Sequence, residues 1–408
     1  MQNFFYNIPT KVSFGKGVVE ELPVYIKEYG TRVLLVYGGG SIKRTGLYDT
    51  VIKLLEEHQI QHTELSGVEP NPRLSTVEKG VAIAREWKAD VIVPIGGGST
   101  IDCAKAIAAA VEYEGNPWDL VEDGEKIDKV LPIITIPTMS ATGSEMDPFA
   151  VITNEATKQK MDLAAESLYP AYSILDPTFT YSVPPYQTAA GVADIMSHIF
   201  EVYFADVEDT FMQDRVMEAL LKTLVHYGPI ACREPENYEA RANIMWASEW
   251  AINGMIACGK SGPWPAHSIE HQLSAYYDIT HGHGLAIVTP VLMEYILNEK
   301  SKKRLASYGV NVWDIDKNLP ELEIARKAIQ ATRELYESMG LHLDLGELGV
   351  PYGDDFESMA EQAASEGLEH CLVPLYKEDV IKIYERCFQK KTNETRNIMG
   401  RWTPGRMS

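Results

Sequence analysis

The sequence predicts an α/β N-terminal part with a Rossmann-like parallel sheet, followed by an all-α C-terminal part. The length of 408 residues suits two domains, because domains commonly hold about 100–200 residues. Strand and helix patterns alternate up to about residue 176, and long helical patterns dominate from Pro184 onward. We therefore expect one domain at residues 1–180 and a second at residues 181–408.

The strands of the first part are short apolar runs that end in turns. Arg32–Tyr37 ends in three glycines, and so does Asp90–Ile95. Such runs, alternating with helical segments, are typical of a parallel sheet with helices on both faces. The expected strands are residues 32–37, 61–65, 90–95 and 131–137, and the expected helices are residues 47–58, 75–88 and 99–111.

In the second part, apolar residues recur at the three- and four-residue spacing of helices. The clearest expected helices are residues 188–204, 215–226, 238–256 and 324–339. No internal repeat or low-complexity segment interrupts them.

Composition excludes several classes of protein. The chain has 37 basic and 58 acidic residues, a net charge of −21, which opposes binding to nucleic acid. No segment reaches the roughly 20 apolar residues of a membrane span. The five cysteines are far apart and contain no CxxC pair, which argues against disulfides and against a thiolate zinc site. The N-terminus lacks the features of a signal peptide, so we expect a cytoplasmic protein.

Two strands end in Gly-Gly-Gly-Ser, at residues 38–41 and 96–99. Glycine lets a backbone approach a ligand closely, and the second turn opens a helix whose amides suit a phosphate. Ser99 or Thr100 could cap that helix. The alternative is a pair of tight turns without a ligand, since neither matches GxGxxG. Two such turns at the carboxyl ends of strands favour a dinucleotide. The polar loop at residues 137–145 offers hydroxyls to the same ligand.

A cluster of histidines with one aspartate lies in the second part. Asp194 and His198 are four residues apart on one expected helix, as are His267 and His271. His281 and His283 follow in Thr280–Gly284. Single histidines are often structural, but imidazoles with one carboxylate suit Zn(II) or Fe(II) with an open position. The cluster therefore predicts a metal site.

These motifs together resemble the iron-containing alcohol dehydrogenase family, most closely its butanol dehydrogenase and NADPH-dependent aldehyde reductase branch. The resemblance covers nearly the whole chain and is carried by Pro9–Gly17, Gly96–Ser99 with Asp102, Pro137–Glu145, Ser173–Glu201 and His267–Gly282. It implies the fold shared with dehydroquinate synthase-like proteins, with a dinucleotide-binding α/β domain and a metal- and substrate-binding helical domain.

The resemblance also implies an activity and roles for single residues. The activity is the interconversion of small, butanol-like primary alcohols and aldehydes by hydride transfer. The metal ligands would be Asp194, His198, His267 and His281, and His271 would be the non-ligand histidine beside the nicotinamide. We expect His271 to be the catalytic histidine that exchanges a proton with the substrate oxygen; the alternative is that it only packs or orients a ligand. The cofactor contacts would be Gly38, Gly39, Gly40, Ser41, Asn71, Gly97, Gly98, Ser99, Asp102, Thr138, Thr142, Ser144 and Lys160.

The loop after the first glycine turn bears on the choice of cofactor. Family members restricted to NAD tend to carry an acid there, whereas this loop reads Ser41-Ile42-Lys43-Arg44. Because Ser41 and Lys43 could hold a 2′-phosphate, we expect NADP(H) in preference to NAD(H). The ligands suit Fe(II) and Zn(II) alike. The resemblance also suggests a homodimer, with residues 4–6 and 12–14 forming an edge hairpin across the dimer or capping their own sheet.

Three alternatives compete with this interpretation. His267–His271 is a literal HxxEH, the inverted metalloprotease pattern, but this reading leaves the glycine turns unexplained. A dehydroquinate synthase-like lyase or a glycerol dehydrogenase would keep the fold and change the reaction. A nucleotide-binding protein without activity is disfavoured because every expected ligand is present.

Overall fold

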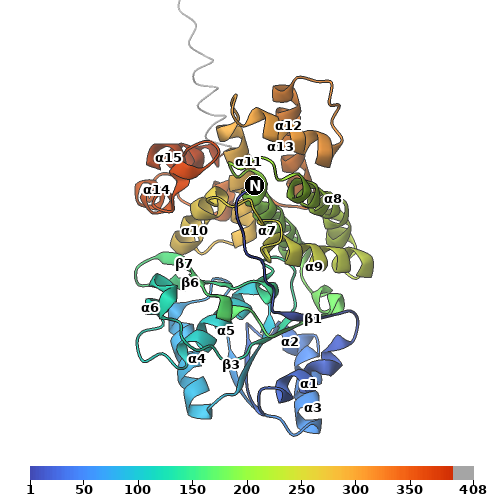
Figure 1. Ribbon diagram of the computed structural model, residues 1–408, viewed down its shortest axis with the longest axis vertical. Helices are drawn as coiled ribbons and strands as arrows, with labels where there is room; N and C mark the ends of the chain where they lie inside the picture. Colours follow the sequence, from blue (N-terminus) through green and yellow to red (C-terminus); the bar gives the residue numbers. More distant parts are fainter. Residues whose placement is uncertain (389–408) are drawn as a thin grey trace, which may run out of the picture.

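The computed structural model describes residues 1–388, which form an α/β part and a helical part, one above the other in Figure 1. The α/β part is built on a six-stranded sheet in which every neighbouring pair of strands is parallel. Across the sheet the order is β1 (Lys11–Phe14), β8 (Tyr172–Leu175), β5 (Ile134–Pro137), β4 (Val91–Gly96), β2 (Arg32–Tyr37) and β3 (Gln61–Ser66).

Helices cover both faces of this sheet, as predicted. Successive residues of a strand point to opposite faces, so Leu34 and Val36 enter one core while Val33 and Leu35 enter the other. The helices of this part are α1 (Leu22–Lys27), α2 (Ser41–Arg44), α3 (Leu47–Glu57), α4 (Leu74–Trp87), α5 (Gly98–Ala110) and α6 (Trp118–Glu122). Both cores are formed mainly by aliphatic residues.

The N-terminal segment adds to its own sheet. β1 pairs in parallel with β8, with Lys11 opposite Tyr172. Within residues 1–388 of this single chain, residues 4–6 belong to no strand, and residues 12–14 lie in β1, which caps its own sheet. The chain start instead reaches the helical part, where the Gln2 amide donates to the Gly259 carbonyl at 2.9 Å.

The helical part is organised around α7 (Pro185–Tyr203), which is buried from Thr188 to Tyr203. A helix that is apolar on every side belongs in the middle of a bundle, and α8, α9, α10 and α11 all pack against α7. The remaining helices are α8 (Phe211–Arg233), α9 (Tyr238–Ile252), α10 (Pro265–Tyr277), α11 (His281–Ile296), α12 (Lys302–Trp313), α13 (Glu321–Ser338), α14 (Phe356–Ala364) and α15 (Lys377–Arg386).

An antiparallel hairpin joins the two parts. It consists of β6 (Phe149–Asn154) and β7 (Gln159–Ala164), and it lies between the sheet and the helices in Figure 1. β6 packs on α5, and β7 packs on α10. Short 3₁₀ turns complete the chain: η1 (Val18–Glu21), η2 (Gly124–Lys126), η3 (Ser144–Met146), η4 (Glu166–Leu168), η5 (Pro177–Thr180), η6 (Leu345–Leu348) and η7 (Leu368–His370).

Two expectations from composition can be compared with the structure. All five cysteines carry free thiols. Among residues 1–388, no helix combines the length and the apolar character needed to cross a membrane.

Candidate metal centre and cofactor edge

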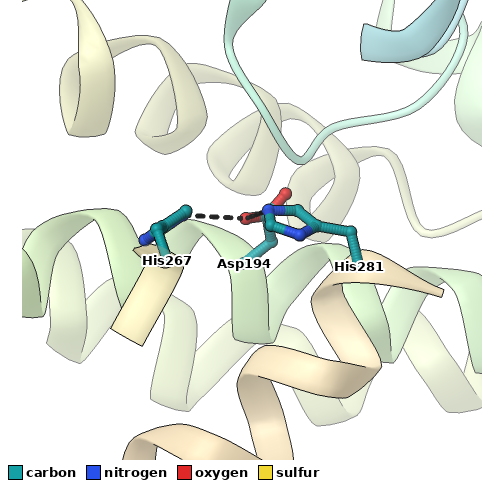
Figure 2. A group of neighbouring side chains, drawn as sticks. All are labelled: Asp194, His267 and His281. Carbon is teal, nitrogen blue, oxygen red and sulfur yellow. Dashed lines mark ion pairs between the residues drawn. The ribbon is translucent and has the colours of Figure 1, made fainter. Parts of the chain in front are cut away.

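Three helices bring the four predicted metal ligands to one point. Asp194 lies on α7, His267 on α10 and His281 on α11, and Figure 2 shows the two imidazoles on either side of the carboxylate. Asp194 Oδ1 is 3.8 Å from His267 Nε2 and 3.7 Å from His281 Nε2. His198, one turn after Asp194, places its Nε2 3.4 Å from the same oxygen. The ligand atoms of Asp194, His267 and His281 all lie within 4.8 Å of one another.

Local sequence explains why the helices meet there. Asp194 and His198 share a face of α7 because they are four residues apart. His281 is the first residue of α11, and Gly282 follows it. A Cβ at position 282 would lie 2.1 Å from the Ala190 carbonyl oxygen of α7. Only glycine lets α11 begin this close to α7, which places His281 beside Asp194.

The site has the properties of a cation site. Asp194 Oδ1 and His267 Nε2 are buried without a hydrogen-bond partner, which is costly unless another group binds them. Burial lowers the pKa of His198 to about 3, which leaves a neutral imidazole able to ligate. Burial raises the pKa of Asp194, but the neighbouring histidines outweigh this effect and keep the carboxyl ionised. One carboxylate and three imidazoles therefore fit Fe(II) or Zn(II).

His267 would have to lose a proton when a cation binds. Burial lowers its pKa, but the neighbouring carboxylates of Asp194 and Glu201, the second through a hydrogen bond, outweigh burial and raise the pKa to about 9. A cation competes with that proton for Nε2, so we expect metal binding to release it.

Two buried carboxylates orient the imidazoles from behind. Glu201 accepts from the His267 ring nitrogen Nδ1 at 3.0 Å and from the His267 backbone amide at 2.9 Å. Glu270 accepts a short hydrogen bond from His281 Nδ1. Sequence reasoning gave neither residue this role, because the contacts join different helices. Their signal in the sequence is a carboxylate three residues from a ligand: Glu201 after His198, and Glu270 after His267.

The other two histidines of the predicted cluster, His271 and His283, lie in different places in the structure. His271 stays in the site, with its ring centroid 5.3 Å from that of His281, and Glu270, His271 and His281 form a second close group. Burial and the charge of Lys160 lower the pKa of His271 well below its usual value. His283 lies elsewhere and bonds Tyr186 and the His342 carbonyl.

The predicted cofactor residues gather at the carboxyl edge of the sheet. Residues 38–41 follow β2, residues 97–99 follow β4 and Thr138 follows β5, and these strands are neighbours. Gly40 adopts φ +90°, a left-handed conformation. A Cβ at Gly98 would lie 2.2 Å from Thr142 Oγ1, so the third loop packs directly on the second glycine turn.

The N-cap of α5 is Gly97, and no side chain caps the start of this helix. The expectation that Ser99 or Thr100 caps this helix is therefore wrong, because the Ser99 hydroxyl instead donates to the Pro70 carbonyl. Free amides at a helix N-terminus suit an anionic group such as a phosphate.

Hydrogen bonds hold the polar loop in place at this edge of the sheet, and they involve Asp102, Thr142 and Ser144. Ser144 Oγ donates to Asp102 Oδ1 at 2.6 Å, and the Val151 amide donates to Asp102 Oδ2 at 3.1 Å. The Ser144 amide donates to Thr142 Oγ1 at 3.2 Å. Burial raises the pKa of Asp102 to about 6. These contacts tie the polar loop to α5 and β6.

Asn71 and Lys160 connect the cofactor edge to the metal group. Lys160 on β7 places its Nζ 3.1 Å from Asn71 Oδ1 and 3.5 Å from His281 Nδ1. Asn71 Nδ2 donates to Asp278 Oδ1, at the end of α10, at 2.8 Å. Burial lowers the pKa of Lys160. The two groups of predicted residues therefore form one continuous site between the two parts of the chain.

A parallel α/β sheet with glycine-rich turns at its carboxyl edge, together with an Asp–His cation site on a helical bundle, fits a metal-dependent dehydrogenase. Two family models match the chain: "Iron-containing alcohol dehydrogenase" over residues 9–177, and "Fe-containing alcohol dehydrogenase family, C-terminal" over residues 188–388. The chain belongs to the iron-containing alcohol dehydrogenase family, as predicted.

Individual relatives cover almost the whole chain. NADH-dependent butanol dehydrogenase A of Clostridium acetobutylicum is 54% identical over 390 residues, which are 95% of this chain and 100% of that protein. NADPH-dependent aldehyde reductase YqhD of Escherichia coli is 37% identical over 374 residues, 90% of this chain and 94% of that protein. The crystal structure of NADH-dependent butanol dehydrogenase A from Thermotoga maritima superposes with a TM-score of 0.90 and 37% identity, covering 95% of this chain and 99% of that one.

These matches confirm the predicted fold, family and class of enzyme. They also argue against the metalloprotease alternative, in which the Glu of HxxEH would act as a general base. Here that residue, Glu270, is buried and bound to His281.

Proposed function

We propose that this enzyme interconverts small primary alcohols, such as butanol, and their aldehydes by hydride transfer with NAD(P)(H). The proposal assigns one Fe(II) or Zn(II) to Asp194, His198, His267 and His281. The observation that carries it is the buried, unpartnered Asp194 Oδ1, which faces three imidazoles next to the glycine-rich edge.

When bound, the cation supplies Lewis acidity toward the substrate oxygen, and the nicotinamide gives or takes the hydride. The residues of the chain bind and orient. The amides at the start of α5 and the turn at residues 38–41 hold the dinucleotide, and Asn71 and Lys160 lie between the dinucleotide edge and the metal ligands. Glu201 and Glu270 fix the ring orientation of His267 and His281.

His271 is the proposed proton-transfer residue. Its pKa lies well below the usual value because of burial and Lys160, so the ring is neutral and can accept a proton. In alcohol oxidation His271 takes the hydroxyl proton of the substrate and passes it to solvent, and in aldehyde reduction a proton from solvent reaches the substrate oxygen through the same ring.

Some observations favour NADP(H) as the cofactor, and others favour NAD(H). NADP(H) is favoured by the loop at residues 41–44, which has no acid, and by the likeness to an aldehyde reductase whose name specifies NADPH. NAD(H) is favoured by the more similar butanol dehydrogenase, whose name specifies NADH. In the structure, Lys43 already contacts Glu64, which weakens the argument for a 2′-phosphate site.

Three further expectations belong to this proposal. A homodimer is supported by β1, an edge strand, and by the exposed aromatic residues Phe4 and Phe5 of the N-terminal segment and Phe14 of β1. A cytoplasmic location is supported by the five free thiols. A division into domains near residue 180 is supported by the end of β8 at Leu175 and the start of α7 at Pro185.

The test follows the absorbance of NADH and NADPH separately, with butanal as substrate. Enzyme stripped of metal is compared with enzyme reloaded with Fe(II) or Zn(II). We expect metal-dependent oxidation of the reduced nucleotide, lost in His267→Ala. No oxidation of either nucleotide by folded, reloaded enzyme with butanal or with longer and shorter aldehydes would contradict the proposed function.

A further inference from the structure

A polar cluster beside the first glycine turn has no part in the mechanism above. Its centre is the carboxylate of Glu64 on β3, which accepts hydrogen bonds from the hydroxyls of Tyr37, at 2.5 Å, and Tyr48. Lys43 Nζ lies 3.9 Å from Glu64 Oε2 and 4.3 Å from the centre of the Tyr48 ring. His62 Nε2 is 4.0 Å from Glu64 Oε1.

This cluster is connected to the turn that is proposed to hold the dinucleotide. Tyr37 is the last residue of β2, and residues 38–40 follow it. Glu64 precedes Gly67 by three residues, and the Gly67 amide donates to the Tyr37 and Gly38 carbonyls at 3.0 and 3.2 Å. Lys43 belongs to α2, the helix that the glycine turn opens. Its side chain folds back from that helix onto Tyr37, Tyr48 and Glu64.

The protonation states of Glu64 and Tyr48 follow from their contacts. Burial alone would raise the pKa of Glu64, but the hydrogen bonds from Tyr37 and Tyr48 outweigh it and lower the pKa, so the carboxylate is ionised. The hydrogen bond to Glu64 raises the pKa of Tyr48 to about 12, so this hydroxyl remains a donor. Lys43 is therefore paired with an anion that two tyrosines hold in place. A 2′-phosphate, which carries about −1.5 to −2 charges, would meet a fixed carboxylate and a lysine already turned toward that carboxylate, whereas a free ribose 2′-hydroxyl is uncharged.

We propose that Glu64 is a specificity-determining residue that makes the enzyme prefer NAD(H) to NADP(H), by holding Lys43 away from the 2′ position and by repelling a 2′-phosphate. The inference rests on the proposed binding of the dinucleotide at residues 38–41. Glu64, on the neighbouring strand β3, supplies the negative charge that the loop at residues 41–44 lacks.

The test measures the dissociation constants of NAD⁺ and NADP⁺ by isothermal titration calorimetry, with the metal-loaded enzyme. We expect wild-type enzyme to bind NAD⁺ more tightly. In Glu64→Gln, which keeps an acceptor for the tyrosines, the Kd of NADP⁺ should fall about fivefold or more, since a like charge is removed and Lys43 is released. The Kd of NAD⁺ should change less than about twofold. Adding Lys43→Gln to Glu64→Gln should reverse the gain for NADP⁺.

Two further variants complete the design. Glu57→Gln is the matched control, because it makes the same charge change at an exposed residue of α3 that pairs with Lys53; both constants should stay as in wild type. Lys43→Gln alone keeps the test valid if Glu64→Gln does not fold. If Glu64 already holds Lys43 in the wild type, Lys43→Gln should raise the Kd of NADP⁺ less than about twofold. If Lys43 instead binds the 2′-phosphate, the same substitution should raise this Kd about tenfold.

An unchanged ratio of the two constants in folded Glu64→Gln would overturn the inference, as would tighter binding of NADP⁺ than NAD⁺ by wild type. Failure to bind either dinucleotide would instead contradict the proposed function, so the two failures are distinguishable.

Discussion

Each metal-facing imidazole in this chain has a carboxylate behind it or beside it, and the roles of these carboxylates differ. Asp194 offers an unpartnered oxygen to the site, whereas Glu201 has its oxygen occupied by two N–H donors of His267. A carboxylate that accepts from the far nitrogen of a ligating histidine fixes its tautomer and raises its basicity. Glu201 therefore acts through His267, as a positioning residue.

Replacing Glu201 by Gln should weaken metal binding about 10- to 100-fold, because such outer carboxylates typically contribute that much. The measurement is competition for Zn(II) with a chromophoric chelator. Glu218→Gln is the control, since Glu218 is a buried carboxylate of the same part of the chain that binds Tyr203 and Asn311 instead of a histidine. Equal metal affinity in Glu201→Gln and wild type would show that Glu201 has only a packing role.

His271 should behave differently from the four predicted ligands. We expect His271→Gln to lower kcat about 100-fold or more, the usual contribution of a general acid–base group, and to leave the metal dissociation constant within about twofold. Rates are measured with NADH and butanal, and metal affinity by the same chelator competition. His370→Gln, an exposed histidine, is the control. A large loss of metal affinity in His271→Gln would make this residue a ligand.

At the scale of elements, the site depends on how closely α7 and α11 approach. Gly282 has no room for a side chain, because the Ala190 carbonyl of α7 occupies the place of a Cβ. The clash would be with backbone, which cannot turn aside as a side chain can. The spacing of these two helices and the position of His281 therefore depend on the same residue.

Gly282→Ala should destabilise the protein by about 1–3 kcal/mol, the usual cost of overpacking, and should also weaken metal binding by moving His281 away from Asp194. Thermal unfolding and chelator competition measure the two effects. Gly39→Ala is compared for stability alone, since a Cβ at Gly39 meets nothing within 4 Å. A stable variant with wild-type metal affinity would mean that α7 and α11 can separate without cost to the site.

At the scale of the whole molecule, buried acids lie where the two parts of the chain meet. Glu145 belongs to η3 and Glu249 to α9, and these two elements pack against each other. Both side chains are almost fully buried. Burial raises the pKa of Glu145 to about 6, and burial together with the charge of Glu145 raises the pKa of Glu249 well above its usual value.

These raised pKa values predict how stability depends on pH. The folded state binds the protons more tightly than the unfolded state, whose carboxyls titrate near 4.5. The contribution of these two carboxyls to the free energy of unfolding is fully present below about pH 4.5, and it is lost as pH rises through about 6 and beyond. Glu249→Gln replaces one of these carboxyls by a side chain that does not titrate. The Tm of the variant minus the Tm of the wild type should therefore increase as the pH is raised from about 5 to about 8.

Scanning calorimetry of the full chain at several pH values measures this difference. Glu57→Gln, at an exposed carboxylate, should give a flat difference in Tm across the same range. A flat difference for Glu249→Gln as well would show that Glu249 is ionised in the folded protein.

The sequence by itself determined the class of fold and the residues that meet in the site. The parallel sheet was predictable because each strand is a short apolar run between helical patterns, and these patterns are local. Helical spacing places Asp194 with His198 on one helix face and His267 with the proposed catalytic His271 on another, and the long motifs that indicate the family add His281 to the proposed ligands. Helix ends were predicted less well: α8 extends to Arg233, beyond the expected residue 226.

Only the tertiary structure decided how these residues are partnered. No neighbour in the sequence indicates a partner for Lys43, but in the fold its side chain contacts Glu64. The contact forms because β3, which carries Glu64, runs beside β2. Glu270 bonds His281, and Asn71 bonds Asp278 across a separation of 207 residues. Such contacts join elements that are distant along the chain, and no local pattern encodes them. They depend on the packing of whole helices and strands, and they decide which charged side chains are already paired with one another.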